Sequence, residues 1–216
     1  MKNADIHSKT KYIQNMVNTE CFFSPQMSET WDKEFVIENE AESRKYILVF
    51  QGKVPEQVNL TVRLAKCGTR VEIVSVFLGK GKMRSKLNFT ILHEAPETFG
   101  RILFKTALFD ESRVDFAGML KIAKGADGSD SYLQARALIL SKNAIARLDP
   151  GLEILANNVK ASHGATVGRL RAEDLFYLES RGMEHKDAER MLVAGFFTDA
   201  FRMMPEEVGK KVSKYF

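Results

Sequence analysis

Cysteine is scarce in this chain, because only Cys21 and Cys67 occur among its 216 residues. They lie far apart in unlike surroundings, which excludes a disulfide framework or a cysteine metal motif. In a reducing compartment we expect both to be free thiols. Lys66 and Arg70 could lower the pKa of the Cys67 thiol, but no base pairs with it in sequence, which favours a neutral turn cysteine.

Long apolar runs are also missing. No segment approaches the roughly 18 apolar residues that cross a bilayer. The first residues, MKNADIHSKTKYIQ, lack the apolar stretch of a secretory signal. Apolar residues make up 44% of the chain and charged residues 28%, which is ordinary for a globular protein. We therefore expect a cytoplasmic protein with no membrane partner.

A dense block of charge of one sign is absent as well. The chain has 32 Lys and Arg residues and 28 Asp and Glu residues, and the two kinds are mixed in most windows. Proteins that bind nucleic acid usually gather their cations on one face. The sequence therefore predicts no nucleic-acid partner. A basic nucleic-acid-binding protein is kept as an alternative, which a steep salt dependence of binding would reveal.

From about Phe35 onward, apolar and polar residues alternate with period two, which is typical of half-buried strands. Glycine-rich and acidic turns separate these stretches. One central residue per strand can be chosen at steps of 13 to 18 residues: Leu60, Ile73, Phe89, Phe104, Leu120, Leu138 and Ile154. Near-regular spacing is typical of a sandwich or of a repeating solenoid, and periodicity alone leaves both open.

The pattern divides the chain into three parts. Residues 1–33 are polar and are expected to form a loosely held N-terminal arm, with a short helical turn around Tyr12 to Val17 as an alternative. Residues 34–168 form the β core. Residues 169–216 form a small helical subdomain.

The helical part is expected to begin at Ala172 and to include a last helix after Pro205. Apolar residues at three- and four-residue steps predict one buried face: Ala188, Met191, Leu192, Phe196, Ala200 and Met203. The region is rich in aromatic side chains: Phe176, Tyr177, Phe196, Phe197 and Phe201. Core packing explains most of them.

The segment from Asp149 to Gly182 joins the strands to the helices. It carries His163 together with the turn-forming residues Gly164, Gly168 and Gly182, which predict a corner that leaves the imidazole accessible. Six short motifs follow one another in this order: LEI, NNVK, SHGATVG, LFYL, SRG and, further on, AGFF. With them the chain closely resembles the SufB/SufD family, the scaffold subunits of the SUF iron–sulfur cluster assembly machinery. The SHG spelling looks more like SufD than SufB. The resemblance covers roughly the second half of the chain.

The resemblance implies a mainly β fold, with a right-handed parallel β-helix core followed by a small C-terminal α-helical subdomain. It also implies a non-catalytic scaffold that docks an ABC-type ATPase, SufC, through its C-terminal helices, with the five aromatic residues as candidate anchors. Arg171 stands where the family has an acidic N-cap, and it cannot accept the free backbone N–H bonds. The second partner would be a SufB-like subunit or another copy in a homodimer. We expect this contact around residues 144–160, where a solenoid ends in unpaired backbone groups.

His163 is the leading candidate for cluster assembly. A neutral imidazole is a good iron ligand and proton carrier near pH 7, although a histidine bonded to backbone at a fold junction is the structural alternative. The resemblance favours the first reading, because the SufD histidine at this position is implicated in forming the nascent cluster at the SufB–SufD interface. A cluster demands about four ligands, mostly thiolates. The chain has no cysteine after Cys67, so we expect no cluster bound stably by this chain alone, only a transient one at an interface.

The sequence does not favour an enzyme. Ser162 and His163 are not part of a nucleophile elbow. The glycine pairs at Gly79–Gly81 and Gly125–Gly128 lack the Lys-Ser/Thr of a P-loop, so the chain is not expected to be an ATPase. A β-helix carbohydrate-acting enzyme is the remaining alternative. It would need clustered carboxylates along a β face, and the pattern shows none.

Overall fold

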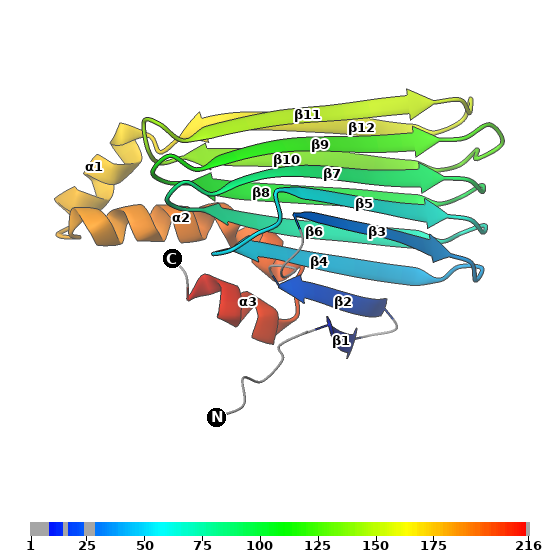
Figure 1. Ribbon diagram of the computed structural model, residues 1–216, viewed down its shortest axis with the longest axis horizontal. Helices are drawn as coiled ribbons and strands as arrows, with labels where there is room; N and C mark the ends of the chain where they lie inside the picture. Colours follow the sequence, from blue (N-terminus) through cyan, green and yellow to red (C-terminus); the bar gives the residue numbers. More distant parts are fainter. Residues whose placement is uncertain (1–8, 15–16, 24–28, 215–216) are drawn as a thin grey trace.

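A computed structural model describes residues 9–14, 17–23 and 29–214, in which strands precede helices (Figure 1). The strands are β1 (Lys9–Gln14), β2 (Val17–Phe23), β3 (Thr30–Ile37), β4 (Ser43–Gln51), β5 (Gln57–Leu64), β6 (Arg70–Gly79), β7 (Arg84–His93), β8 (Phe99–Leu108), β9 (Arg113–Ile122), β10 (Asp130–Ile139), β11 (Ile145–Ile154) and β12 (Lys160–Arg169). The helices are α1 (Ala172–Ser180), α2 (His185–Arg202) and α3 (Glu206–Ser213). None of the helices in these described ranges is both long and apolar enough to span a bilayer.

The strands form two sheets, and the chain passes from one to the other at each step. The seven-stranded sheet has the order β1-β2-β4-β6-β8-β10-β12, and the five-stranded sheet has the order β11-β9-β7-β5-β3. Neighbouring strands pair in parallel, except the antiparallel pair β1 and β2. Two successive strands, one from each sheet, therefore make one turn of a parallel β-solenoid of about five turns. This confirms the β-helix and excludes the sandwich.

Each turn, which we call a rung, lies in register on the one before it. Strands β6, β8, β10 and β12 begin at residues 70, 99, 130 and 160, so one rung takes 29 to 31 residues. Equivalent side chains stack into columns that fill the space between the two sheets. Phe104 and Phe116, for example, face each other from opposite sheets with ring centroids 4.1 Å apart. The interior is one continuous apolar core.

The two sheets differ on their outer faces. Strands of the five-stranded sheet such as β5, β7 and β9 alternate strictly between buried and half-buried or exposed residues. Strands β4, β6 and β8 contain unbroken buried runs instead. The reason is a second core, in which α2 and α3 cover the outer face of the seven-stranded sheet. A continuous apolar run is expected where both faces of a strand are buried.

The buried side of α2 differs from the predicted one. Ala188, Val193, Phe197 and Ala200 are buried, whereas Met191 is half exposed. Ala188 and Ala200 are on the predicted face, but its centre lies at Val193 and Phe197, about one residue further along than Leu192 and Phe196. Val193 and Phe197 belong to the second core, while Phe196 and Met203 of the predicted face are partly buried against it.

The N-terminal part also departs from the prediction. Residues 17–23 form β2, which pairs in parallel with β4, and Cys21 is fully buried in the second core. The helical turn considered for Tyr12 to Val17 is wrong, because β1 and β2 occupy the described part of that segment. Residues 1–8, 15–16 and 24–28 of the predicted arm lie outside the described residues.

Candidate functional site

The last rung of the solenoid consists of β11 and β12, and we call it the end rung. Strand β12 ends the seven-stranded sheet and bonds to β10, while β11 ends the five-stranded sheet and bonds to β9. Figure 1 shows the two strands together along one side of the molecule. In the described part of the chain neither has a neighbour on its outer side. The end rung therefore presents two rows of unpaired backbone groups.

His163 lies on β12 and not in a turn. The glycine-rich corner predicted around Gly164 and Gly168 is wrong, because both residues lie inside a regular strand of ten residues. The strand forms because it takes its register from β10 at every residue. Gly182 does lie in a turn, between α1 and α2, with a φ of 87°.

The strand places His163 at the end of an interior column. Its register partner on β10 is Leu133, whose own partner on β8 is Ile102, and both are buried in the main core. Partners on parallel strands direct their side chains to the same side of the sheet. The imidazole therefore stands over the end of the core and is exposed because no further rung covers it. No hydrogen bond joins it to any described residue, so the backbone-bonded histidine considered from the sequence is not observed.

Apolar side chains surround this position. Leu148 and Leu152 of β11 extend the interior columns and are half-buried. Ile154, Leu155 and Val167 are exposed, which is unusual for large aliphatic residues gathered at one end of a core. The end rung is thus an uncovered cross-section of the apolar core that carries one imidazole.

The described residues provide no metal site on their own. They contain no group of three or more His, Cys, Asp or Glu side chains that could hold an ion. Cys21 is on β2, and burial raises the pKa of its thiol to about 12. Cys67 lies in the turn before β6, where desolvation and then Glu97 and Glu40 raise the pKa of its thiol. The lowered pKa considered for Cys67 is therefore wrong, and neither thiol lies on the end rung.

The five predicted aromatic anchors separate into two groups. Phe197 is fully buried in the second core, and Phe196 and Phe201 pack against it. Phe176 and Tyr177 of α1, in contrast, are 72% and 57% exposed. Three of the five thus hold α2 on the sheet, and two are accessible to another protein.

Helix α1 has no buried residue and projects to the side of the solenoid, next to the ends of the strands (Figure 1). It begins as predicted at Ala172, with Arg171 at the N-cap position and no side-chain cap. The Arg171 guanidinium instead donates to the Asp174 carboxylate, with Nη2 2.6 Å from Oδ1. The α1 surface, which we define by Phe176 and Tyr177, is the second exposed apolar feature.

One concave surface was not predicted. Cationic side chains from turns of successive rungs gather beside the five-stranded sheet, in a groove described below. Gly52-Lys53 and Gly81-Lys82 are 29 residues apart, which is the length of one rung. The sequence therefore shows that they occupy equivalent turns only when the rung length is known.

Comparison with known proteins gives consistent results. Residues 5–196 match the family described as SUF system FeS cluster assembly, SufBD core domain. The iron–sulfur cluster assembly protein SufD of Escherichia coli is 38% identical over 107 residues, which are 50% of this chain and 25% of that protein. SufD of Bacillus subtilis is 32% identical over 151 residues, 70% of this chain and 35% of that protein. SufB of Bacillus subtilis is 29% identical over 161 residues, 72% of this chain and 34% of that protein. The chain thus spans between a quarter and about a third of these relatives.

Proposed function

The chain belongs to the SufBD core family of the SUF iron–sulfur cluster assembly system, and on this premise we propose that it is a non-catalytic scaffold subunit in the assembly of such clusters. The observation that carries the proposal is the end rung. It combines an apolar surface that needs a partner with an imidazole placed in the middle of that surface.

The end rung supports a contact with a second β-solenoid. Strands of a partner can continue both sheets, and the partner's own core then covers Ile154 and Val167. The partner is a SufB-like subunit or a second copy of this chain. In either case the contact includes β12, so it extends somewhat beyond the residues 144–160 expected from the sequence.

In this arrangement His163 lies within the contact and serves as one ligand of a transient cluster, which is the cargo of the assembly. The remaining ligands come from a SufB-like partner, because a cluster demands about four ligands, mostly thiolates, and a second copy of this chain would bring only the same two cysteines. Cys21 and Cys67 are on other parts of the solenoid and take no part. The chain alone therefore holds no stable cluster. Its expected location is the cytoplasm.

The test is anaerobic reconstitution with a SufB-like partner and the ATPase, read by visible absorption. We expect His163→Ala to lower the cluster yield by about tenfold or more, the range seen when a group that supports a metal site is lost. The variant should stay folded, since the ring is exposed and bonds to no described residue.

Thr166→Ala is the matched control, because Thr166 is also exposed on β12. It should leave the yield unchanged. An unchanged yield for His163→Ala, with the complex still formed, would refute the role of the imidazole.

We also propose that the α1 surface docks the ABC-type ATPase, SufC. Phe176 and Tyr177 are large, exposed and adjacent, as expected of anchors at a protein contact. Deletion of the whole helical region is a poor test, because α2 and α3 cover the second core and their loss would uncover it.

The sharper test replaces both exposed rings in the full chain. Phe176→Ala with Tyr177→Ala should abolish co-purification with the ATPase, whereas Val36→Ala on the exposed part of β3 should not. Circular dichroism should show the same secondary structure in both. Retention of the ATPase by the double variant would exclude α1 as the docking site.

A further inference from the structure

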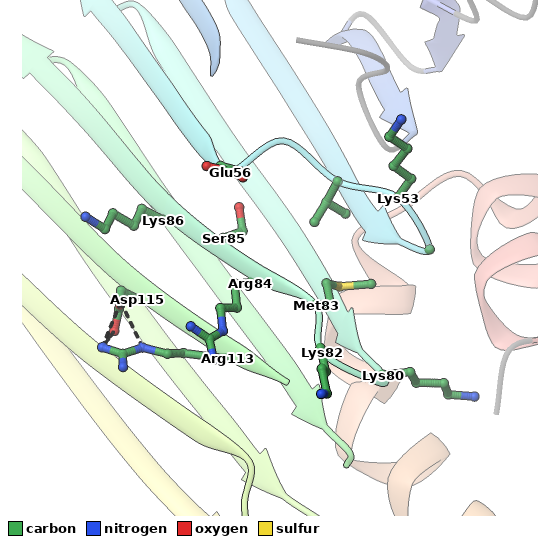
Figure 2. Close-up of a pocket in the computed structure, with 12 residues that line it drawn as sticks. Lys53, Glu56, Lys80, Lys82, Met83, Arg84, Ser85, Lys86, Arg113 and Asp115 are labelled. Carbon is green, nitrogen blue, oxygen red and sulfur yellow. Dashed lines mark hydrogen bonds and ion pairs between the residues drawn. The ribbon is translucent and has the colours of Figure 1, made fainter. Parts of the chain in front are cut away.

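A groove of about 750 Å³ lies where the chain crosses from the seven-stranded to the five-stranded sheet (Figure 2). Its walls come from the turns that precede β5 and β7 and from the first residues of β7 and β9. Six cationic side chains line it: Lys53, Lys80, Lys82, Arg84, Lys86 and Arg113. They come from three successive rungs, and Figure 2 shows Arg84 and Arg113 near each other with Lys53, Lys80 and Lys86 spread around them. The repeat of the solenoid thus gathers charges that are scattered in the sequence.

The groove contains the whole positive excess of the molecule. Glu56 and Asp115 are its two acidic residues, which leaves four positive charges in excess. The formal net charge of the chain is also +4, so the remaining 26 basic and 26 acidic residues balance. Such a local excess of positive charge favours the binding of anions.

Most of these cations have no acidic partner. Asp115 accepts hydrogen bonds from Arg113, with distances of 3.2 and 3.3 Å. Lys53, Lys82, Arg84 and Lys86 form no ion pair with any described residue. All four are exposed, so their charges are available to a ligand.

Register places one pair of like charges and one pair of opposite charges in the groove. Arg84 and Arg113 are register partners on β7 and β9, whereas Lys86 is the partner of Asp115. Like charges placed directly opposite each other on paired strands repel. A bound anion would offset this repulsion between Arg84 and Arg113.

We propose that this groove binds a small molecule that carries two or three adjacent phosphate groups. Arg and Lys side chains are the usual phosphate donors, and Arg84 can offer a bidentate contact. The volume lies within the range of small-molecule sites. Val54 and Met83, which are half-buried in the wall, provide an apolar surface for the organic part of the ligand.

The same residues argue against a nucleic acid as the occupant. Single-stranded nucleic acids are usually held by aromatic side chains that stack on the bases. None of the described residues that line the groove is aromatic. Glu56 also interrupts the basic surface, and a long phosphate backbone would have to pass it.

The test is calorimetric titration of the full chain with ADP, inorganic pyrophosphate and orthophosphate, without any partner protein. ADP and pyrophosphate should bind more tightly than orthophosphate, and ADP should bind at least as tightly as pyrophosphate if the apolar wall contributes. Arg84→Gln with Lys86→Gln should weaken both by about tenfold or more, because two charge-assisted contacts are lost. Lys124→Gln with Lys142→Gln removes the same charge from exposed turns elsewhere and should leave the affinity unchanged.

A second readout does not depend on measurable heat. Without ligand, the Arg84→Gln, Lys86→Gln variant should melt at about the temperature of the parent, because neither side chain forms an ion pair with a described residue. ADP should raise the melting temperature of the parent and not of the variant.

Three outcomes would overturn the proposal. They are no binding of ADP or pyrophosphate to the parent, equal weakening in the two double variants, and tighter binding of a single-stranded oligonucleotide that ADP does not displace. None of them bears on the role of the end rung, because the groove and His163 are on different surfaces of the solenoid.

Discussion

His93 shows how the core accommodates a polar side chain. It is fully buried at the end of β7, and both ring nitrogens are bonded: Nδ1 lies 2.7 Å from Thr98 Oγ1, and Nε2 lies 2.9 Å from Ser131 Oγ. Gly100 leaves room for the ring, since a Cβ there would lie 2.8 Å from Nε2. The network joins three rungs, because Thr98 also bonds to Ser129.

This histidine makes stability depend on pH. Burial, and then the charge of Arg101, lowers the pKa of His93 to about 4. The folded state thus keeps the ring neutral, while the unfolded state takes up a proton below about pH 6.5. His93 therefore does not reduce the free energy of unfolding above pH 6.5. As the pH drops from 6.5 toward 4, it lowers the free energy of unfolding by on the order of 3 kcal/mol.

Urea unfolding at pH 7 and pH 4.5 measures this effect. His93→Leu should be less stable than the parent at pH 7, by about 1–3 kcal/mol, because the buried Thr98 and Ser131 hydroxyls each lose one hydrogen-bond partner. It should also lose the part of the pH dependence that belongs to the imidazole. An identical pH dependence in both proteins would contradict the assignment.

The sequence located some single residues better than others. It singled out His163, because a lone histidine among small residues is conspicuous, but it placed the ring in a turn. Gly164 and Gly168 indicate turns in a local pattern, whereas β10 provides a template that holds them extended. Core packing was expected for most of the aromatic residues, but the predicted buried face of α2 left out Phe197 for a similar reason. Its burial depends on a sheet far away in the sequence, and spacing within the helix does not reveal it.

Helix α2 is fastened to the seven-stranded sheet by one buried cation. The Lys105 side chain on β8 is 2% exposed, and its Nζ donates hydrogen bonds to the Phe196 carbonyl and the Asp199 carboxylate. Nζ also lies 4.6 Å from the centroid of the Phe196 ring. A buried ammonium needs such partners, because an uncompensated charge in the interior is costly.

We expect substitution of Asp199 to destabilise the protein more than substitution of Lys105. Asp199→Ala should lower the free energy of unfolding by about 2–3 kcal/mol, since it leaves the buried ammonium without its carboxylate. Lys105→Met should cost about 1 kcal/mol or less, because an apolar chain of similar length suits the second core. Adding Asp199→Ala to Lys105→Met should then cost little more, and additive losses in this double-mutant cycle would refute the coupling.

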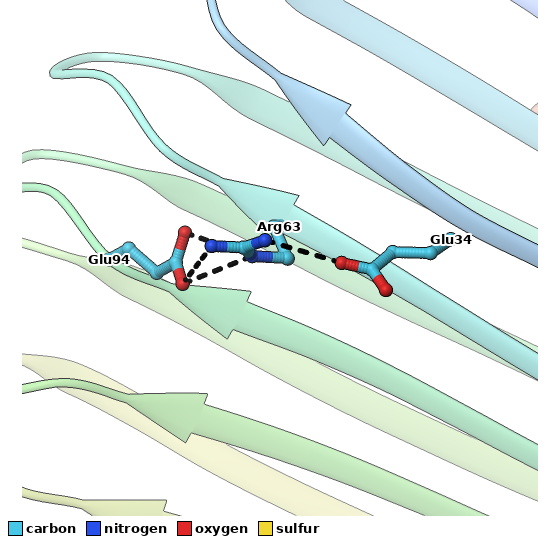
Figure 3. A network of polar contacts seen from close by, with 3 residues as sticks. All are labelled: Glu34, Arg63 and Glu94. Carbon is cyan, nitrogen blue, oxygen red and sulfur yellow. Dashed lines mark hydrogen bonds and ion pairs between the residues drawn. The ribbon is translucent and has the colours of Figure 1, made fainter.

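A partly exposed ion-pair network on the five-stranded sheet contrasts with the buried contact between Lys105 and Asp199 (Figure 3). Arg63 on β5 contacts Glu94 with Nη2 2.9 Å from Oε1 and reaches Glu34 on β3 with Nη1 3.3 Å from Oε1. The Arg63 and Glu34 side chains are 40% and 56% exposed. Such pairs contribute about 0–1 kcal/mol, so Arg63→Gln should change the stability far less than Asp199→Ala.

At the scale of the whole molecule, the two ends of the solenoid are unlike. The first rungs are flanked by β1, β2 and α3, whereas no described strand or helix covers the end rung. The sequence predicted a contact at the bare end. It could not establish the solenoid itself, because the strand spacing also suited a sandwich, and the resemblance decided between them. Pairing partners are about one rung apart, and a local pattern does not record which strands meet.

The exposed end predicts how the chain associates. Ile154→Lys with Val167→Lys places two charges on the end rung and should abolish its contact with a second solenoid, because a buried unpaired charge is costly. Val36→Lys is the control, since Val36 and Ile154 are both 39% exposed and Val36 is on β3 at the other end of the same sheet. Light scattering after size exclusion, with and without a SufB-like partner, measures the association. Unchanged association of the double variant would exclude the end rung as the contact.

The in-register stacking of rungs has a consequence for how such a chain can change its length. Phe99 N donates to the Thr69 carbonyl, and Arg70 and Phe99 are register partners, so the two positions are translationally equivalent. Excision of residues 70–98 would join Thr69 to Phe99 and bring β4 and β5 against β8 and β9 without altering which side chains face inward. Genes of this architecture can therefore grow or shrink by whole modules, and both ends of the protein stay the same while the distance between them changes.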